Sequence, residues 1–256
     1  MLQRVHLTAL TLLLVAETAT AAPQVTVTAI SPNSPAVLLV GTSVQVSFDY
    51  TALEQNPRVV AIPYSNGSPS PDDSVHTDVL PSASGAGTCQ FTILTGIVNV
   101  DALRMEMWSS NQPDALLFAT VIPVAYAFNA KGAVYNLGLD PPSVGAMLDF
   151  GDTVHVAFSY QATEAVRIFF QPYAGYSAAP SSSYGPSVTL PGGDGLGLSY
   201  FTLRSEPAIV DRMRVQMWRS NMSILLVDAY LPISYVFGVP TLQQPVTWGK
   251  LKTKRW

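Results

Sequence analysis

Alternating apolar and polar residues are clearest from Val100 to Asn111, and the same pattern returns 110 positions later, from Val210 to Asn221. Successive side chains of a β-strand point to opposite faces, so both segments are predicted to be strands with one buried face. The predicted core face holds Leu103, Met105, Met107, Met213, Val215 and Met217. The opposite face, which we expect to meet solvent, holds Arg104, Glu106, Trp108, Arg214, Gln216 and Trp218.

The repeat covers most of the chain. Alternation at 44–50 returns at 154–160, and segment 58–64 matches 167–173 one residue out of step, which indicates a one-residue change in the preceding loop. This spacing fits one small domain per copy, so the sequence predicts a tandem duplication. The predicted parts are a signal peptide at 1–21, β-sandwich domains at 22–130 and 131–238, and a basic tail at 239–256.

Each copy offers about seven short strands separated by turn residues, and no helical period is longer than the N-terminal apolar segment. The predicted fold class is therefore all-β, with two tandem seven-stranded antiparallel β-sandwiches. Segments 65–74 and 174–186 differ most between the copies and are predicted to be long surface loops. The glycine-rich segments 80–87 and 190–197 are predicted to be hairpin turns.

Proline recurs inside the last apolar segment of each copy, as Pro123 and Pro232. Because proline cannot donate a hydrogen bond to a sheet, these positions predict an edge, a bulge or a change of sheet. Residues 129–132 form the whole connection between the copies. So short a connection predicts two domains placed end to end with a restricted hinge.

Two stretches, 30–48 and 141–158, resemble the opening strands of immunoglobulin-like and fibronectin-III-like modules of secreted and cell-wall proteins. The residues that carry the resemblance are Ile30-Ser31-Pro32 and Pro141-Pro142, with the strands 41–48 and 151–158 that follow them. The resemblance implies a β-sandwich of the immunoglobulin type. The chain departs from it where such modules often place tryptophan, at Phe48 and Phe158, and it lacks the paired cysteines of true immunoglobulin domains.

The N-terminus has the charged, apolar and small-residue order of a secretory signal, ending in Ala19-Thr20-Ala21. We expect cleavage after Ala21 and a secreted, extracellular chain. The apolar segment is too short to span a bilayer, and no later segment is long enough, so no transmembrane segment is expected.

The charge balance argues against nucleic acid as a partner. Residues 22–249 contain sixteen Asp or Glu against eight Lys or Arg, while Lys250, Lys252, Lys254 and Arg255 make the tail basic. The single cysteine, Cys89, is expected to be a buried thiol, and its repeat position holds Ser199. The sequence does not predict an oligomeric state.

The sequence predicts no catalytic residue, no metal site and no cofactor. His6, His76 and His155 are the only histidines, and none stands at metal-ligand spacing to another His or Cys. Asp101/Asp211 and Glu54/Glu164 are the acids that recur between the copies, and nothing in the spacing brings them together. The chain is therefore expected not to be an enzyme, with an unrecognised hydrolase as the less favoured alternative.

The outward faces of the repeated strands are the best candidates for binding. A flat ring beside planar hydrogen-bond donors suits a sugar ring or a protein surface, and the candidate ligand-binding residues are Arg104, Trp108, Asn111, Arg214, Trp218 and Asn221. The rings could instead pack on the sandwich edge or between domains. In a eukaryotic host, Asn66 and Asn221 fit the N-glycosylation acceptor pattern.

These features favour a secreted, non-enzymatic binding, adhesion or structural protein of the cell surface or extracellular matrix. A carbohydrate-binding pair of modules is the alternative. The expected partner is an extracellular protein or polysaccharide.

Overall fold

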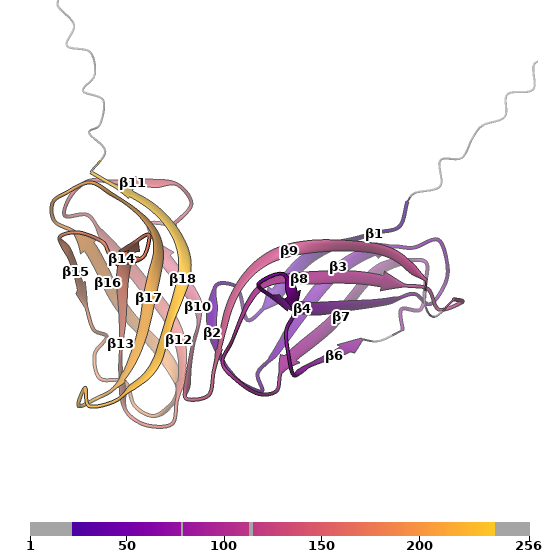
Figure 1. The fold of residues 1–256 in the computed structure, drawn as a ribbon, viewed down its shortest axis with the longest axis horizontal. Helices are drawn as coiled ribbons and strands as arrows, with labels where there is room; N and C mark the ends of the chain where they lie inside the picture. Colours follow the sequence, from indigo (N-terminus) through magenta and orange to yellow (C-terminus); the bar gives the residue numbers. More distant parts are fainter. Residues whose placement is uncertain (1–21, 78, 113–114, 239–256) are drawn as a thin grey trace, which may run out of the picture.

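The computed structural model describes residues 22–77, 79–112 and 115–238, and all the regular structure in these ranges is β-strand (Figure 1). The strands of the first half are β1 (Gln24–Ser31), β2 (Ala36–Leu39), β3 (Ser43–Thr51), β4 (Arg58–Ser65), β5 (Ser68–Pro69), β6 (Asp73–Thr77), β7 (Ser84–Ile93), β8 (Val98–Trp108) and β9 (Leu116–Asn129). Those of the second half are β10 (Gly132–Asp140), β11 (Ala146–Leu148), β12 (Thr153–Ala162), β13 (Val166–Ala174), β14 (Ser177–Ala178), β15 (Ser182–Gly185), β16 (Gly193–Leu203), β17 (Ala208–Arg219) and β18 (Leu225–Phe237). Within these ranges no helix has the length and hydropathy needed to cross a membrane.

Strand order is the same in the two halves. The first half has one sheet in the order β1-β3-β7-β6 and a second in the order β2-β9-β8-β4-β5. The second half has β10-β12-β16-β15 and β11-β18-β17-β13-β14, so each strand occupies the place of the strand nine earlier. Two packed sheets in this order form an immunoglobulin-like β-sandwich, and the chain is all-β as predicted. The duplication itself remains a prediction from the sequence.

The structure corrects several details of that prediction. Within the described residues each half has nine strands rather than seven, because the segments expected to be loops contain the short strands β5, β6, β14 and β15. Not every pair is antiparallel, since β2 with β9 and β11 with β18 pair in parallel. Strands of two to five residues are too short to show a period, which is why the pattern of the sequence did not reveal them.

The glycine-rich segments were also wrongly predicted to be turns, because Gly87 and Gly197 lie inside β7 and β16. A Cβ at Gly197 would overlap Cζ of Phe158, and one at Gly87 would lie 2.9 Å from Cζ of Phe48. Glycine is needed here so that a core aromatic ring can lie across the neighbouring strand. The prolines, by contrast, fall where expected, since both Pro123 and Pro232 adjoin a register shift in their ladders.

Each half has its own apolar core, made by the faces that the alternation predicted. Tyr126 on β9 lies in the first core and donates its hydroxyl to the carbonyl of Pro32 at 2.7 Å. Tyr235 on β18 repeats this in the second core, with 2.6 Å to the carbonyl of Pro141. These buried hydrogen bonds tie the last strand of each half to the turn that follows its first strand.

The halves are joined through strand β2. It pairs with β9 of the first half and, at Val37, with Val134 of β10, so one nine-stranded sheet runs through both halves (Figure 1). Ala36 and Leu38 belong to the first core, whereas Val37 belongs to the second. The short connection therefore comes with a shared strand, and the restricted hinge stays a prediction from the sequence.

Candidate functional site

The first predicted binding strand, β8, holds its outward side chains in an ordered network. Glu106 is only 6% exposed, which contradicts the predicted solvent-facing position. Its carboxylate lies 2.7 Å from Nε of Arg104 and accepts a hydrogen bond of 2.9 Å from Nε1 of Trp108. The Trp108 ring is half-buried, and its polar edge is occupied by this bond. Glu106 thus links Arg104 to the Trp108 ring, although the alternation pattern predicted that its carboxylate would be exposed to solvent.

Asn111 belongs to a different cluster. Its side-chain amide donates to Glu54 at 2.9 Å, and the Ser109 hydroxyl donates to the same carboxylate at 3.0 Å. The backbone amide of Ser110 adds a bond of 2.7 Å. These hydrogen bonds, the one from Ser109 first, hold the pKa of Glu54 below its usual value. The cluster anchors the turn after β8, which explains why an acid stands at this position.

On the second predicted binding strand, β17, Arg214 has a different partner. Its Nε and Nη2 donate to the two carboxylate oxygens of Asp228 at 2.7 and 2.6 Å, a bidentate pair that raises the pKa of the guanidinium. Nη1 lies 3.4 Å from the Tyr173 hydroxyl, as Arg104 lies 3.4 Å from the hydroxyl of Tyr64. The arginine–tyrosine contact is therefore common to the two halves, while the carboxylate partner is not.

Around Arg214 the structure places aromatic residues that sequence reasoning missed. The Arg214 guanidinium lies 5.8 Å from the Tyr230 ring centre, and that of Arg212 lies 4.8 Å from the centre of the exposed Tyr176 ring. Burial, the largest cause, raises the pKa of Tyr230. These residues come from β17, β18 and the turn after β13, so only a comparison of the two copies position by position could have suggested them. We call Tyr173, Tyr176, Arg212, Arg214, Asp228 and Tyr230 the tyrosine–arginine cluster.

The remaining predicted residues lie apart from this cluster. Trp218 is half-buried, four positions along β17 from Arg214, a separation of about 13 Å along a strand. Asn221 is exposed in the turn after β17, and its Oδ1 accepts hydrogen bonds from the backbone amide and hydroxyl of Ser223. Asn66 is exposed in the turn between β4 and β5. The six candidates do not converge on one site, and their binding role stays a prediction.

The recurring aspartates have structural partners in turns. Asp101 accepts the backbone amide of Asn66 at 2.8 Å, and Asp211 accepts that of Gly175 at 3.0 Å. Asp101 therefore stabilises the turn after β4, and Asp211 stabilises the turn after β13. Among the described residues no group of three or more His, Cys, Asp and Glu side chains is placed to hold a metal ion. Cys89 is buried as predicted, and burial raises the pKa of its thiol to about 12.

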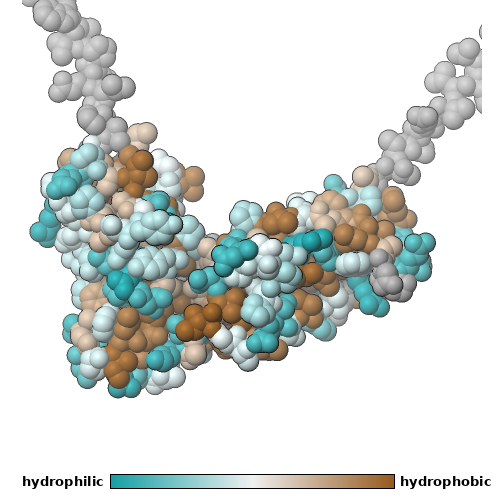
Figure 2. Space-filling view, viewed as in Figure 1, coloured by the Kyte–Doolittle hydropathy of each residue, from teal (hydrophilic) through white to brown (hydrophobic). Residues whose placement is uncertain are grey.

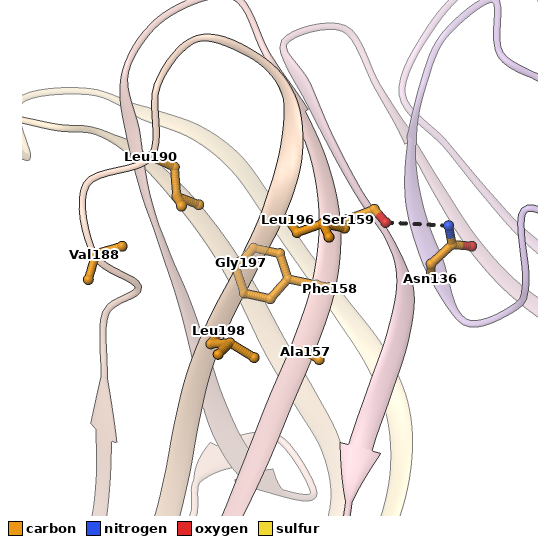
Figure 3. Close-up of a pocket in the computed structure, with 9 residues that line it drawn as sticks. All are labelled: Asn136, Ala157, Phe158, Ser159, Val188, Leu190, Leu196, Gly197 and Leu198. Atoms are coloured by element: carbon orange, nitrogen blue, oxygen red, sulfur yellow. Dashed lines mark hydrogen bonds between the residues drawn. The ribbon is translucent and has the colours of Figure 1, made fainter.

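An apolar groove of about 570 Å³ lies on the second half (Figure 3). Figure 3 shows Leu196 and Leu198 of β16 on one side and Val188 and Leu190 on the other, with the Phe158 ring between them. At one end, Nδ2 of Asn136 lies 3.4 Å from the Ser159 hydroxyl. We call this feature the β16 groove.

The groove arises because the chain changes sheets. Strand β15 pairs only with residues 200–203 of β16, and the chain then crosses to the other sheet, where Pro186 bridges Phe169 and Leu190 bridges Val166. In the described pairings, residues 193–199 of β16 have β12 on one side and no strand on the other. An open strand edge therefore runs beside the apolar walls.

The first half repeats the open edge, at residues 84–88 of β7, and the crossing to the other sheet, where Val79 bridges Arg58, but it does not repeat the large side chains. Leu196 and Leu198 are 79% and 71% exposed, and their counterparts on β7 are Ala86 and Thr88. Large aliphatic side chains at these solvent-facing positions add nothing to the core. Exposed apolar groups that are specific to one copy of a repeat are better explained by an interaction than by folding.

No family model and no curated protein matches the chain. Among solved structures it is similar to the titin domains Z1Z2 in complex with telethonin, with 11% identity over 86% of this chain and 98% of that one, at a TM-score of 0.25. A titin I-band fragment is 8% identical over 85% of this chain and 66% of that one, with a TM-score of 0.26. A further tandem of titin Ig domains is 10% identical over 84% of this chain and 100% of that one, with a TM-score of 0.22. The immunoglobulin-like assignment accordingly rests on the strand order described above.

Proposed function

We propose that the chain is a secreted, non-enzymatic binding or adhesion protein of the cell surface or extracellular matrix. The observation that carries the proposal is the β16 groove, where exposed leucines and an open strand edge lie side by side. An extended protein segment uses both features, because its backbone pairs with the edge and its alternate side chains enter the groove. The pairing of β2 with both halves would place this surface at a set distance from the N-terminal half.

The groove is tested by charge substitutions with matched controls in the other half. Labelled protein is applied to a panel of extracellular-matrix proteins and polysaccharides, and the variants are Leu196→Asp and Leu198→Asp. We expect these variants to lose at least about tenfold in affinity for the bound partner, equivalent to about 1.4 kcal/mol. Ala86→Asp and Thr88→Asp, at the same positions of the first half, should keep wild-type affinity.

Two results would contradict the proposal. Equal loss in the β16 and β7 variants would show that the groove is not the binding surface. The purified chain could also be found to hydrolyse a polysaccharide or an ester. If a single surface substitution abolished that activity, the protein would be an enzyme.

Carbohydrate binding is the second candidate, and the tyrosine–arginine cluster is the observation that favours it. The exposed Tyr176 ring and the Arg214–Asp228 pair place a flat apolar face near fixed donors and acceptors. Polysaccharide pull-down that is lost in Tyr176→Ala and kept in Leu198→Asp would favour this candidate over the groove. Trp218→Ala separately tests the predicted tryptophan, which lies outside the cluster. Trp108→Ala tests the corresponding strand of the first half.

Secretion is proposed from the sequence of residues 1–21, which lie outside the described residues. N-terminal sequencing of the exported protein should begin at Ala22. A mature chain that retains Met1 would contradict both the signal peptide and the extracellular location.

A further inference from the structure

Strand β11 of the second half is the structural counterpart of β2, the strand that joins the halves. In β2, Val37 stands opposite Ala127 of the parallel strand β9. In β11, Met147 stands opposite Val236 of the parallel strand β18, and Ala127 and Val236 occupy equivalent places in their strands. Met147 therefore corresponds to Val37 in both register and sheet position.

At the junction within the chain, this position is covered. Val37 has no exposed surface, because it bridges Val134 of β10 and packs in the core of the second half together with Ala127. At the far end of the molecule its counterpart Met147 is 75% exposed, and Val236 is half-buried. Apolar residues are visible in Figure 2 at the end of the second half where Figure 1 labels β11. One surface is thus buried in the first half and open in the second.

The open end is more apolar than the junction that it resembles. Asn99 lines a small cavity at the junction, and its counterpart Ile209 is exposed beside the β11 end of the sandwich. Met147 is the other large apolar side chain exposed there. These aliphatic side chains leave water only if something covers this end of the sheet.

The matching surface is present at the opposite end of the molecule. Strand β10, which docks on β2, has β1 as its counterpart, and β1 is the edge of its own sheet in the described structure. Val25 opposes Tyr50 just as Val134 opposes Tyr160, so Val25 corresponds to Val134.

The side chains around this edge are suited to an apolar partner. At the junction, Asp228 and Tyr230 of β18 line the cavity beside Val37. Their counterparts on β9 are Ala119 and the exposed Val121, which replace a charge and a phenol with aliphatic groups. Both ends of the molecule thus replace polar groups of the internal junction with apolar ones.

We propose that copies of the chain associate head to tail, with β11 of one copy pairing with β1 of the next. Met147 would then bridge Val25 of the next copy as Val37 bridges Val134 within the chain. Because the two surfaces differ, the contact is heterologous, and repeating it forms a ring or an open filament. The occupant of the β11 edge is therefore a second copy, and the association would present many β16 grooves at once.

The test is sedimentation velocity of the mature chain, residues 22–256, over a concentration series without any added partner. We expect the mean sedimentation coefficient to rise with concentration, and Met147→Asp or Val121→Asp alone to abolish the rise. Leu198→Asp, on the exposed β16 groove, is the control and should sediment like the wild type. Chemical denaturation of each variant checks that the half carrying the substitution remains folded.

A mixing experiment then separates this interface from others. Met147→Asp keeps its β1 end and Val121→Asp keeps its β11 end, so an equal mixture should form heterodimers and nothing larger. A monomer at every concentration would overturn the proposal. This holds if another segment of the same chain covers β11, and it holds if β11 stays uncovered. Self-association of Met147→Asp alone or of Val121→Asp alone would also overturn it, because each variant lacks one of the two surfaces. None of these results depends on whether the β16 groove binds a partner.

Discussion

At the scale of single residues, Glu106 is where alternation and burial disagree. Its backbone position is outward, as the period of a strand requires, but the Trp108 ring and the Arg104 side chain cover it and bond its carboxylate. Gln216, the counterpart in the second half, is half-buried, and Arg214 beside it pairs with Asp228 instead. Glu106 is thus buried and bonded to two neighbouring side chains, whereas Gln216 at the same strand position is half-buried like many surface residues.

Glu106→Ala should therefore lower the free energy of unfolding by about 1–3 kcal/mol, because it removes the acceptor of two partly buried donors. Gln216→Ala should change it by no more than about 0.5 kcal/mol. Chemical denaturation of the two variants measures the difference. Equal, small effects would mean that the sequence-based expectation of a surface role for Glu106 holds after all.

Glu54 makes the stability of the turn after β8 depend on pH. Its pKa is lowered in the folded chain, chiefly by the Ser109 hydrogen bond, so folding favours the charged form. The stabilisation is complete above the unfolded-state pKa and is lost as the pH falls through the folded-state pKa. The relevant window is below the ordinary value of 4.5.

In that window, wild type and Glu54→Gln should converge in unfolding free energy, while at neutral pH the wild type should be the more stable. Urea denaturation at a series of pH values measures the difference. A difference that stays constant down to the most acidic pH would show that the carboxylate charge does not hold the turn.

At the scale of elements, the close approach of β16 to a core ring decides how the second half packs. Gly197 opposes Phe158 in the β12–β16 ladder, and the ring lies over the place where a side chain would begin. Gly138 on β10 has room for a side chain, because a Cβ there would lie 3.8 Å from Cβ of Ala157, an ordinary contact distance.

Gly197→Ala should destabilise the second half by about 1–3 kcal/mol, because the Phe158 ring must move within a packed core. Gly138→Ala should stay within about 0.5 kcal/mol of wild type. Thermal or urea unfolding distinguishes the two. If Gly197→Ala were neutral, the ring would have room that the structure does not give it.

At the scale of the whole molecule, the junction makes the two halves unequal. Each half has its own core, but that of the second half includes Val37 and Ala127 from the first. The domain boundaries predicted from the sequence assign both residues to the other unit. A fragment of the second half alone would leave the place of these side chains open to water.

Expression of residues 22–130 and 132–238 as separate fragments should give two units that each unfold cooperatively. The second fragment should be less stable than the same half in the full chain by about 1.5–3 kcal/mol, the usual contribution of one fully buried aliphatic side chain such as Val37. Denaturant unfolding of fragments and full chain measures this. Failure of either fragment to fold would show that the cores are not separate.

The alternation of side chains was enough to predict the all-β class, the inward faces of the long strands and the buried Cys89, because strand period and burial act within one segment. The alternation could not predict how far Arg104, Trp108 and Trp218 are exposed to solvent. Their burial depends on which side chains from β4, β8 and β9, or from β13, β17 and β18, come to lie beside them.

Tertiary structure alone decided the features on which the functional proposals depend. The β16 groove exists because residues 186–190 cross to the opposite sheet beside the exposed Leu196 and Leu198. The tyrosine–arginine cluster exists because β13, the turn after it, β17 and β18 meet, and Met147 is uncovered because β11 lies at the far edge of the second sandwich. Each depends on contacts between residues far apart in the chain. A periodic pattern specifies which way a side chain points, and only the packed sheets specify what it meets there.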